Sequence, residues 1–259
     1  MIRNETRLLA TKAFMFTPEQ AEAIFRLQGE ANDAMSTAWR TTCDQHIPYF
    51  RAAYIEAIEA LTAHGYKWWK KEQPNSEHIK MELIDILHFV VSNELRDRIQ
   101  VMEAYPSGEI KMESLEAAMS LTNIIEYVEY DMTSVSTDYR NVNELPFAEL
   151  IDQFLIASLV NRSAMFQWLC AMFDYMKMTP NEVFGMYVGK NALNKLRAKY
   201  GQAEGKYVRQ WFTFMDDNDA LTKFIHRNVE NNDPITEESV TNYLESTYHK
   251  QVISKNKQP

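Results

Sequence analysis

The chain has 259 residues, 46% hydrophobic and 24% charged, which is the composition of a globular protein with a sizeable core. Its net charge of −9 argues against a nucleic-acid partner, because neutralising backbone phosphates requires a basic surface. Two cysteines, no signal-peptide pattern and no apolar run of membrane-spanning length indicate a cytoplasmic protein without a membrane partner (the host cytoplasm for a phage protein).

The chain is expected to be all-α, because seven glycines and eight prolines are few for the turns of a sheet-rich protein. No alternating pattern is long enough to predict a strand. Thr17-Pro18-Glu19-Gln20 and Thr179-Pro180-Asn181-Glu182 are capping boxes with proline at the first helical position. Gly65 and Gly201 mark the ends of two helices. Apolar periodicity places helices approximately over residues 17–39, 49–64, 76–95, 114–131, 146–176, 180–200 and 236–248.

We expect a single domain over residues 1–259, built as a helical bundle core with a variable helical insertion. The insertion covers 97–143 and begins with a predicted loop that holds Pro106-Ser107-Gly108. Asn161-Arg162-Ser163 is a candidate interruption of the longest predicted helix. The lysine-bearing end, 250–259, is predicted to be disordered.

Two acidic pairs are the main candidates for chemistry, Glu56-Ala57-Ile58-Glu59 and Glu82-Leu83-Ile84-Asp85. Residues three apart on a helix share a face, so each pair projects two carboxylates from one stripe. Two such helices packed side by side would bring four carboxylates together, and hard oxygen ligands suit Mg²⁺. Taken alone, however, either pair is more often a solvated helical face.

The second acidic pair lies in a helix that is apolar on all sides. Such a helix is buried, and buried carboxylates are costly unless they are paired or bind a metal. This setting favours a metal site at Glu56, Glu59, Glu82 and Asp85 over a solvated surface. The apolar neighbours of the second pair are Met81, Leu83, Ile84, Ile86, Leu87, Phe89, Val90 and Val91.

A basic stripe follows the second capping box. Tyr187, Lys190, Asn194 and Arg197 share one helical face, and Arg209 lies beyond a glycine-bearing turn. Lysine and arginine in this arrangement can bind phosphate oxygens, arginine in a bidentate way. A solvated face with a basic C-terminal bias, which the helix dipole favours, explains the same pattern without a ligand.

Several polar and aromatic residues allow two interpretations each. Gln28 and Asn32 lie one turn apart, and their amides suit the edge of a pyrimidine but are also common on amphipathic helices. Trp68 and Trp69 either stack on a base or fill the core, and core packing is the commoner role. His88, one turn beyond the second acidic pair, either contacts substrate or is a hydrogen-bonded core histidine.

The order of these motifs resembles the dimeric, all-α dUTP diphosphatases, within the all-α NTP pyrophosphatase superfamily. The last matching segment begins YVGKNALNKLRAKYGQAEGKYVRQW and closes on Asp216-Asp217-Asn218. The combination of K-N-x-L-N-x-x-R with both acidic motifs is specific, whereas any one segment alone is weak. The matching segments are Leu27-Gln28 through Asn32, Glu56 to Lys70, Glu82 to Phe89, and Tyr187 to Asn218.

The resemblance implies a homodimer that hydrolyses dUTP to dUMP and diphosphate, with dUDP as a further substrate. It also implies two or three Mg²⁺ ions at Glu56, Glu59, Glu82 and Asp85, with Glu56 and Glu59 catalytic and Glu56 orienting the attacking water. The resemblance further implies residues that bind the deoxyuridine nucleotide, at Gln28, Asn32, Trp69, His88, Lys190, Asn194, Arg197 and Arg209.

The chain departs from the family pattern on the phosphate side. Leu196 stands where the family usually has an aromatic residue, and Gln202-Ala203 replaces a tyrosine and a lysine that commonly follow the glycine. Lys199, Lys206 and Arg209 are candidates to replace the missing groups.

Two other functions stay open from the sequence. One is a phage-type enzyme that acts on dCTP as well as dUTP, because Gln28 can present either end of its amide to the base. The other is a catalytically idle helical binding protein. The four retained carboxylates argue against it, since an idle fold need not keep buried charge.

Overall fold

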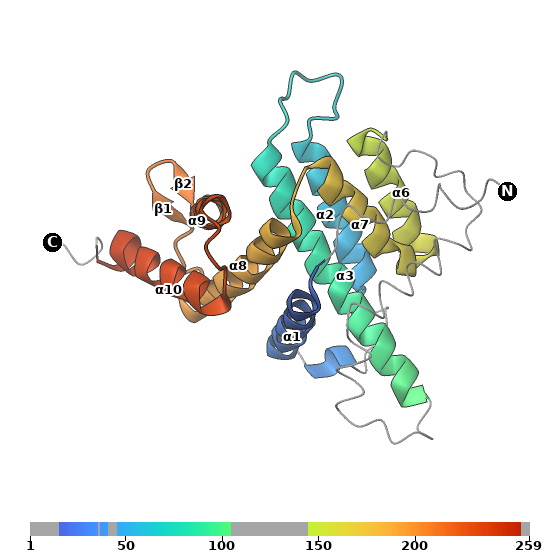
Figure 1. The fold of residues 1–259 in the computed structure, drawn as a ribbon, viewed down its shortest axis with the longest axis horizontal. Helices are drawn as coiled ribbons and strands as arrows, with labels where there is room; N and C mark the ends of the chain where they lie inside the picture. Colours follow the sequence, from blue (N-terminus) through green and yellow to red (C-terminus); the bar gives the residue numbers. More distant parts are fainter. Residues whose placement is uncertain (1–15, 36, 41–45, 105–144, 255–259) are drawn as a thin grey trace. The chain divides into compact units, whose positions relative to one another are not determined.

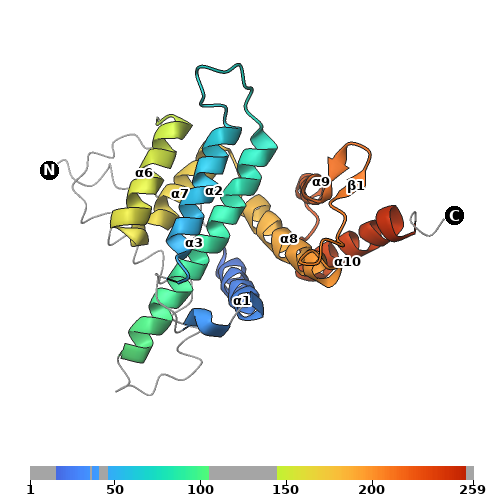
Figure 2. The same ribbon diagram turned by 180° about the vertical axis from the view of Figure 1, so that it is seen from behind.

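The computed structural model describes residues 16–35, 37–40, 46–104 and 145–254 (Figures 1 and 2). It divides the chain into two compact units, Met1–Pro180 and Asn181–Pro259. The predicted helix over 114–131 lies outside the described residues, as does most of the predicted insertion.

The first unit is a bundle of helices, which confirms the all-α prediction (Figure 1). Its long central helix, α3 (Ser76–Ala104), contacts α1, α2 and α7, and α6 packs against α2 and α7. The elements are α1 (Pro18–Met35), a 3₁₀ turn η2 (Thr37–Arg40), α2 (Tyr49–Ala63), α3 (Ser76–Ala104), α6 (Phe147–Val160), a 3₁₀ turn η4 (Arg162–Ala164) and α7 (Met165–Tyr175).

The first helix begins where the sequence predicts. The Gln20 backbone N–H donates to Thr17 Oγ1 at 3.2 Å, and the Thr17 N–H donates to Gln20 Oε1 at 3.0 Å, so the capping box is formed. The end of α2 is also confirmed, because Gly65 follows its cap with a φ of 74°, a left-handed conformation that favours glycine.

Close packing of α2 on α3 determines where the acidic motifs lie. Ala53, Ala57 and Ala60 are fully buried on α2, and such small side chains let two helices approach closely. On α3, Leu83, Ile84, Ile86 and Leu87 are fully buried, which confirms the prediction of a buried apolar helix. The two acidic pairs are therefore carried on neighbouring helices.

The second unit is mostly helical and contains one short hairpin. In its core, Gly189 on the first helix lies against Leu221, and an added Cβ would come within 2.5 Å of the leucine Cδ1. Tyr248 stacks on Tyr207 with ring centroids 5.1 Å apart. The elements are α8 (Pro180–Lys199), β1 (Gln210–Phe212), β2 (Met215–Asp216), α9 (Asp217–Asn231), α10 (Glu237–Tyr248) and a π-helical turn η5 (His249–Ile253).

The longest predicted helix is interrupted at Asn161, which confirms the candidate interruption. Three differences from the sequence-based expectations concern element ends and connections. Helix α3 continues to Ala104, into the predicted loop. The hairpin and α9 were not predicted. The predicted disordered tail begins in η5, which buries Val252, and only 255–259 lie outside the described residues. Among the described helices, none combines the length and apolar character that a membrane span requires.

Candidate active site

The acidic residues of α2 and α3 form a cluster in the first unit. Glu56, Glu59 and Glu82 each offer a carboxylate oxygen, and these three oxygens lie within 4.8 Å of one another. Glu82 is buried, Glu56 is half-buried and Glu59 is exposed, so the cluster reaches from the helix interface to the surface. The fourth predicted ligand, Asp85, is outside this group of three but acts electrostatically on Glu56.

Crowding of like charges is strongest at Glu56. Burial raises its pKa to about 8, and the charge of Asp85 and a hydrogen bond with Glu82 contribute to the same shift. A cation would relieve this repulsion, and an all-carboxylate donor set suits a hard ion such as Mg²⁺. The residues present therefore fit a divalent metal, as the sequence predicted.

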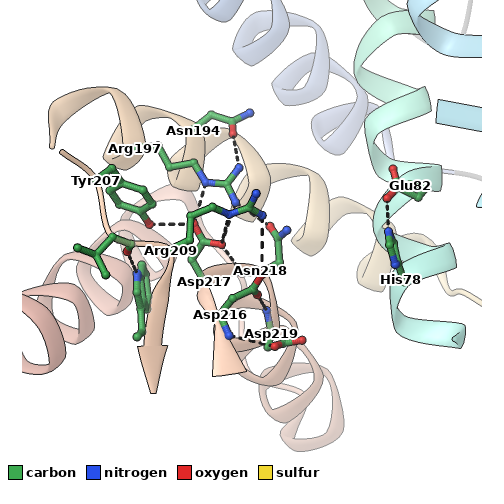
Figure 3. Close-up of polar contacts among 12 residues, drawn as sticks. His78, Glu82, Asn194, Arg197, Tyr207, Arg209, Asp216, Asp217, Asn218 and Asp219 are labelled. Carbon is green, nitrogen blue, oxygen red and sulfur yellow. Dashed lines mark hydrogen bonds and ion pairs between the residues drawn. The ribbon is translucent and has the colours of Figure 1, made fainter. Parts of the chain in front are cut away.

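His78 belongs to the cluster, although it was not predicted. His78 lies one turn before Glu82 on α3, and its Nε2 is 2.6 Å from Glu82 Oε1 (Figure 3). The Asn75 side chain accepts a hydrogen bond from the His78 N–H at 3.1 Å, which anchors the first turn of the helix. The i, i+4 spacing of His78 and Glu82 was a signal available in the sequence, because such residues are neighbours on a helix.

Next to the acidic cluster, α1 and α3 share a buried polar network. Gln28 Oε1 lies 2.8 Å from His88 Nδ1, and Gln28 Nε2 donates to Asn32 Oδ1 at 2.9 Å. Ser92 Oγ lies 3.1 Å from the same Asn32 oxygen. His88 is therefore a buried, hydrogen-bonded histidine, and it contacts one of the two amides predicted to bind the base. The contribution of Ser92 was not predicted.

The aromatic loop between α2 and α3 does not fill the core. Trp68 is 88% exposed and Trp69 is 58% exposed, so the core-packing alternative is wrong for both. Their rings meet edge to face with centroids 5.6 Å apart. Exposed tryptophan is unusual in a globular protein, and it is compatible with stacking on a ligand.

In the second unit, Arg197 is bound by acceptors of its own unit. Its Nε donates to Asp217 Oδ2 at 2.8 Å and its Nη2 to Asp217 Oδ1 at 2.9 Å, a bidentate pair (Figure 3). The same guanidinium donates to Asn194 Oδ1 at 3.3 Å and to Asn218 Oδ1 at 3.1 Å. Arg197 therefore holds two amide side chains in position, in addition to any contact with a ligand.

The Arg197–Asp217 pair is buried and further supported by Tyr207. The tyrosine hydroxyl donates to Asp217 Oδ2 at 2.9 Å. Burial alone would raise the pKa of Asp217, but the hydrogen bond and charge of Arg197 hold it below its ordinary value. Because Asp217 begins α9, this pair joins the predicted basic motif on α8 to a helix that the sequence did not predict.

The other residues predicted to bind the nucleotide in this part of the chain differ in exposure and in their ion pairs. Lys190 is buried on α8, and Asn194 is exposed. Arg209 makes only looser ion pairs, with N–O distances of 3.7 Å to Asp216 and Asp217, and more than half of its side chain is exposed. Lys199, a candidate for the missing phosphate-side lysine, instead pairs with Glu245 of α10.

Comparison with known proteins agrees with the motifs and the fold. A family model described as dUTPase matches residues 20–201, which is more than two thirds of the chain. The match includes every predicted site residue except Arg209. A search of curated proteins found no match. The extent of the family match, together with the helical fold and the acidic cluster, shows that the chain belongs to the all-α dUTPase family and is a dUTP diphosphatase, a hydrolase.

Proposed function

We propose that the chain hydrolyses dUTP to dUMP and diphosphate, and also dUDP to dUMP and phosphate, in a Mg²⁺-dependent reaction. The proposal depends on one observation: Glu56, Glu59 and Glu82 each have a carboxylate oxygen within 4.8 Å of those of the other two. Asp85 completes the set, because its charge contributes to raising the pKa of Glu56. Two or three ions are proposed, held by these four carboxylates.

The bound Mg²⁺ supplies Lewis-acid polarisation of phosphoryl oxygens and offsets negative charge that builds up during attack. Glu56 orients the attacking water and accepts its proton as the water oxygen bonds to phosphorus. The P–O bond that joins the α- and β-phosphates breaks in the same step, which releases dUMP with diphosphate from dUTP, or dUMP with phosphate from dUDP. Glu59 is more exposed on the same helical face and serves as a further metal ligand.

The predicted substrate contacts are retained as part of the proposal. Gln28, Asn32 and Asn194 bind the pyrimidine and sugar, and His88 orients the amide of Gln28. Trp69 supplies an exposed aromatic face for the nucleoside. Lys190, Arg197 and Arg209 are the residues proposed to bind phosphate oxygens.

We also propose that the chain forms a homodimer. Helix α6 exposes Ile156, Leu159 and Val160, and the neighbouring α2 exposes Ile55 and Ile58. Large apolar residues exposed on two neighbouring helices favour an interaction site over a solvated surface. Sedimentation at micromolar concentration tests this, with a dimer mass expected and a monomer mass for Leu159→Glu.

A substrate panel tests the enzymatic proposal. Diphosphate release from dUTP, dCTP, dTTP and UTP is measured with Mg²⁺ and with EDTA. Metal-dependent release from dUTP is expected, and comparable rates on dCTP would instead support the dCTPase/dUTPase alternative. No metal-dependent release from any nucleotide would favour the idle binding protein.

Two glutamate variants on α3 test the metal site. Glu82→Gln should reduce activity at least ~100-fold without loss of helix content, because a neutral amide is a poor ligand for Mg²⁺. Glu77→Gln is the matched control, since Glu77 is exposed in the first turn of the same helix. Full activity of Glu82→Gln would show that the metal is held elsewhere.

A further inference from the structure

The last residue of α10 lies at the centre of an aromatic cluster in the second unit. Tyr248 is only 2% exposed, and its ring centroid lies 4.6 Å from that of Tyr200 and 5.6 Å from that of Trp211, both tilted. The ring of Tyr207 is nearly parallel to it, with an interplanar angle of 12° and centroids 5.1 Å apart. Among these three neighbours, Tyr207 alone is stacked on Tyr248, so this contact constrains the plane of the Tyr207 ring.

The position of Tyr207 depends on Tyr248 because the chain around it is exposed. Tyr207 lies in the irregular segment between α8 and β1, in which residues 202–206 and 208–209 are exposed. Tyr248 holds two successive residues of this segment, since its ring stacks on Tyr207 and its hydroxyl oxygen accepts a hydrogen bond from the Val208 N–H at 3.3 Å. Ordering an exposed segment costs conformational entropy, so these contacts largely decide where the Tyr207 side chain lies.

The hydroxyl of Tyr207 helps to hold a buried carboxylate in place (Figure 3). Asp217 is fully buried, and its Oδ2 accepts from the Tyr207 hydroxyl at 2.9 Å and from Arg197 Nε at 2.8 Å. Burial and the charge of Asp217 raise the pKa of Tyr207, so its phenol keeps its proton and acts as the donor. The carboxylate is thereby held by both side chains, and its bidentate pair with Arg197 fixes the plane of the guanidinium.

The direction of the Arg197 side chain matters because little of it is accessible. Arg197 is 7% exposed, so a phosphate can reach only a small part of it. Arg209 approaches the same Asp217 carboxylate at 3.7 Å but is more than half exposed, and its side chain is therefore less constrained. A small rotation of the buried guanidinium would change how it meets an anion, since charge-assisted hydrogen bonds depend on direction.

We propose that Tyr248 is a positioning residue for phosphate binding. Its ring holds Tyr207 against Asp217, and Asp217 in turn fixes the guanidinium of Arg197. The inference rests on the proposed function, which assigns Arg197 to phosphate oxygens. It extends the site to α10, a helix that the family match does not reach, because that match ends at residue 201.

Affinity for inorganic diphosphate, measured by calorimetry on the full chain in Mg²⁺ buffer, tests this link. Tyr248→Leu removes the stacked ring and should weaken diphosphate binding about fivefold, whereas Tyr248→Phe keeps the stack and should bind within about twofold of the wild type. Tyr207→Phe removes only the hydroxyl and should weaken binding about tenfold, because a hydrogen bond to a charged group is lost. Wild-type affinity in Tyr248→Leu would overturn the proposal.

A double-mutant cycle separates positioning from a general loss of structure. If Tyr248 acts through the Tyr207 hydroxyl, adding Tyr248→Leu to Tyr207→Phe should weaken diphosphate binding no further, and additive losses would show that the two side chains act independently. Tyr243→Leu is the matched control, because Tyr243 also lies on α10 and stacks on Phe224 of α9 with centroids 4.3 Å apart. Its Tm should fall while its diphosphate affinity stays unchanged. An equal loss of affinity in this control would reduce Tyr248 to a structural residue.

The inference and the proposed function can fail separately. If the wild type bound diphosphate but did not hydrolyse dUTP with Mg²⁺, the catalytic proposal would fail, whereas loss of diphosphate binding in Tyr248→Leu would still support the positioning role. A wild type that binds no diphosphate would overturn the inference even if dUTP were hydrolysed. If Tyr248→Leu did not fold, Tyr207→Phe would decide the question, because the link passes through that hydroxyl and unchanged affinity would refute it.

Discussion

Binding of Mg²⁺ should expel a proton from Glu56. Burial and the neighbouring carboxylates raise the pKa of Glu56 to about 8, so near neutral pH the metal-free group is mostly protonated. A metal ligand must be ionised, and binding therefore competes with the proton. With this pKa, protonated Glu56 exceeds the ionised form about 100-fold at pH 6, and the two are about equal at pH 8, so apparent Mg²⁺ affinity should rise about 50-fold across that range.

Calorimetry in two buffers of different ionisation enthalpy measures the proton directly. At pH 7, release of about 0.9 proton from Glu56 is expected per metal-binding event, and Glu56→Gln should abolish most of it. Glu77→Gln, exposed on α3, should release the same number of protons as the wild type. An affinity that is equal at pH 6 and pH 8 would show that Glu56 is already ionised and that the crowding argument is wrong.

The same pKa shift predicts how the metal-free protein responds to pH. Because the pKa of Glu56 is higher in the folded chain than its ordinary value of 4.5, its effect on stability is most favourable below that value and is lost as pH rises through about 8. The Tm of the metal-free protein should therefore fall between pH 6 and pH 9. Addition of Mg²⁺ should reverse most of that fall. A metal-free Tm that rises over this range would contradict the assignment.

Three further substitutions test the contacts of both units. Asp217→Asn should lower the free energy of unfolding in urea by about 3–5 kcal/mol, because it leaves the Arg197 guanidinium buried without a counter-charge. Since the pKa of Asp217 is lowered, the stabilisation that Asp217 provides is present above the ordinary carboxyl range and is lost as pH falls. The acid unfolding transition of the variant should therefore differ from that of the wild type, and an unchanged transition would contradict this expectation. His78→Ala should weaken Mg²⁺ binding about 10-fold in calorimetry, as loss of a group orienting a ligand does, and unchanged affinity would reduce His78 to a surface residue. Gly189→Ala should cost about 1–3 kcal/mol by overpacking against a buried leucine, whereas Gly29→Ala, with open space around its Cβ, should not lower the Tm.

Local signals in the sequence account well for the start and end of most helices. The Thr17 capping box and Gly65 act through neighbouring backbone groups, so they can be identified without knowledge of the fold. Helix α9 was missed although Asp216 and Asp219 form a capping box at its start. Most residues of α9 are polar, so its apolar residues Leu221 and Ile225 do not stand out in the sequence as a buried face. Their burial against α8 is seen only in the structure.

The candidate site was predictable to a similar, limited degree. The acidic motifs predicted a cluster of carboxylates, because their spacing and apolar surroundings are both visible in the sequence. Exposure of Trp68 and Trp69 was not visible, since tryptophan is more often buried and a loop carries no periodicity. The bidentate partner of Arg197 was also hidden, because Asp217 lies twenty residues further along the chain.

The sequence by itself determined most of the helices, the family and the pairing of carboxylates on each helix, because helical spacing is a property of neighbouring residues. Only the tertiary structure decided that α2 and α3 bring the two acidic pairs together, that His88 and Ser92 contact the amides of α1, and that Asp217 engages Arg197. These contacts join residues distant in the chain. Which donor faces which acceptor in these contacts is decided only when the helices have packed, and no local sequence pattern encodes this pairing.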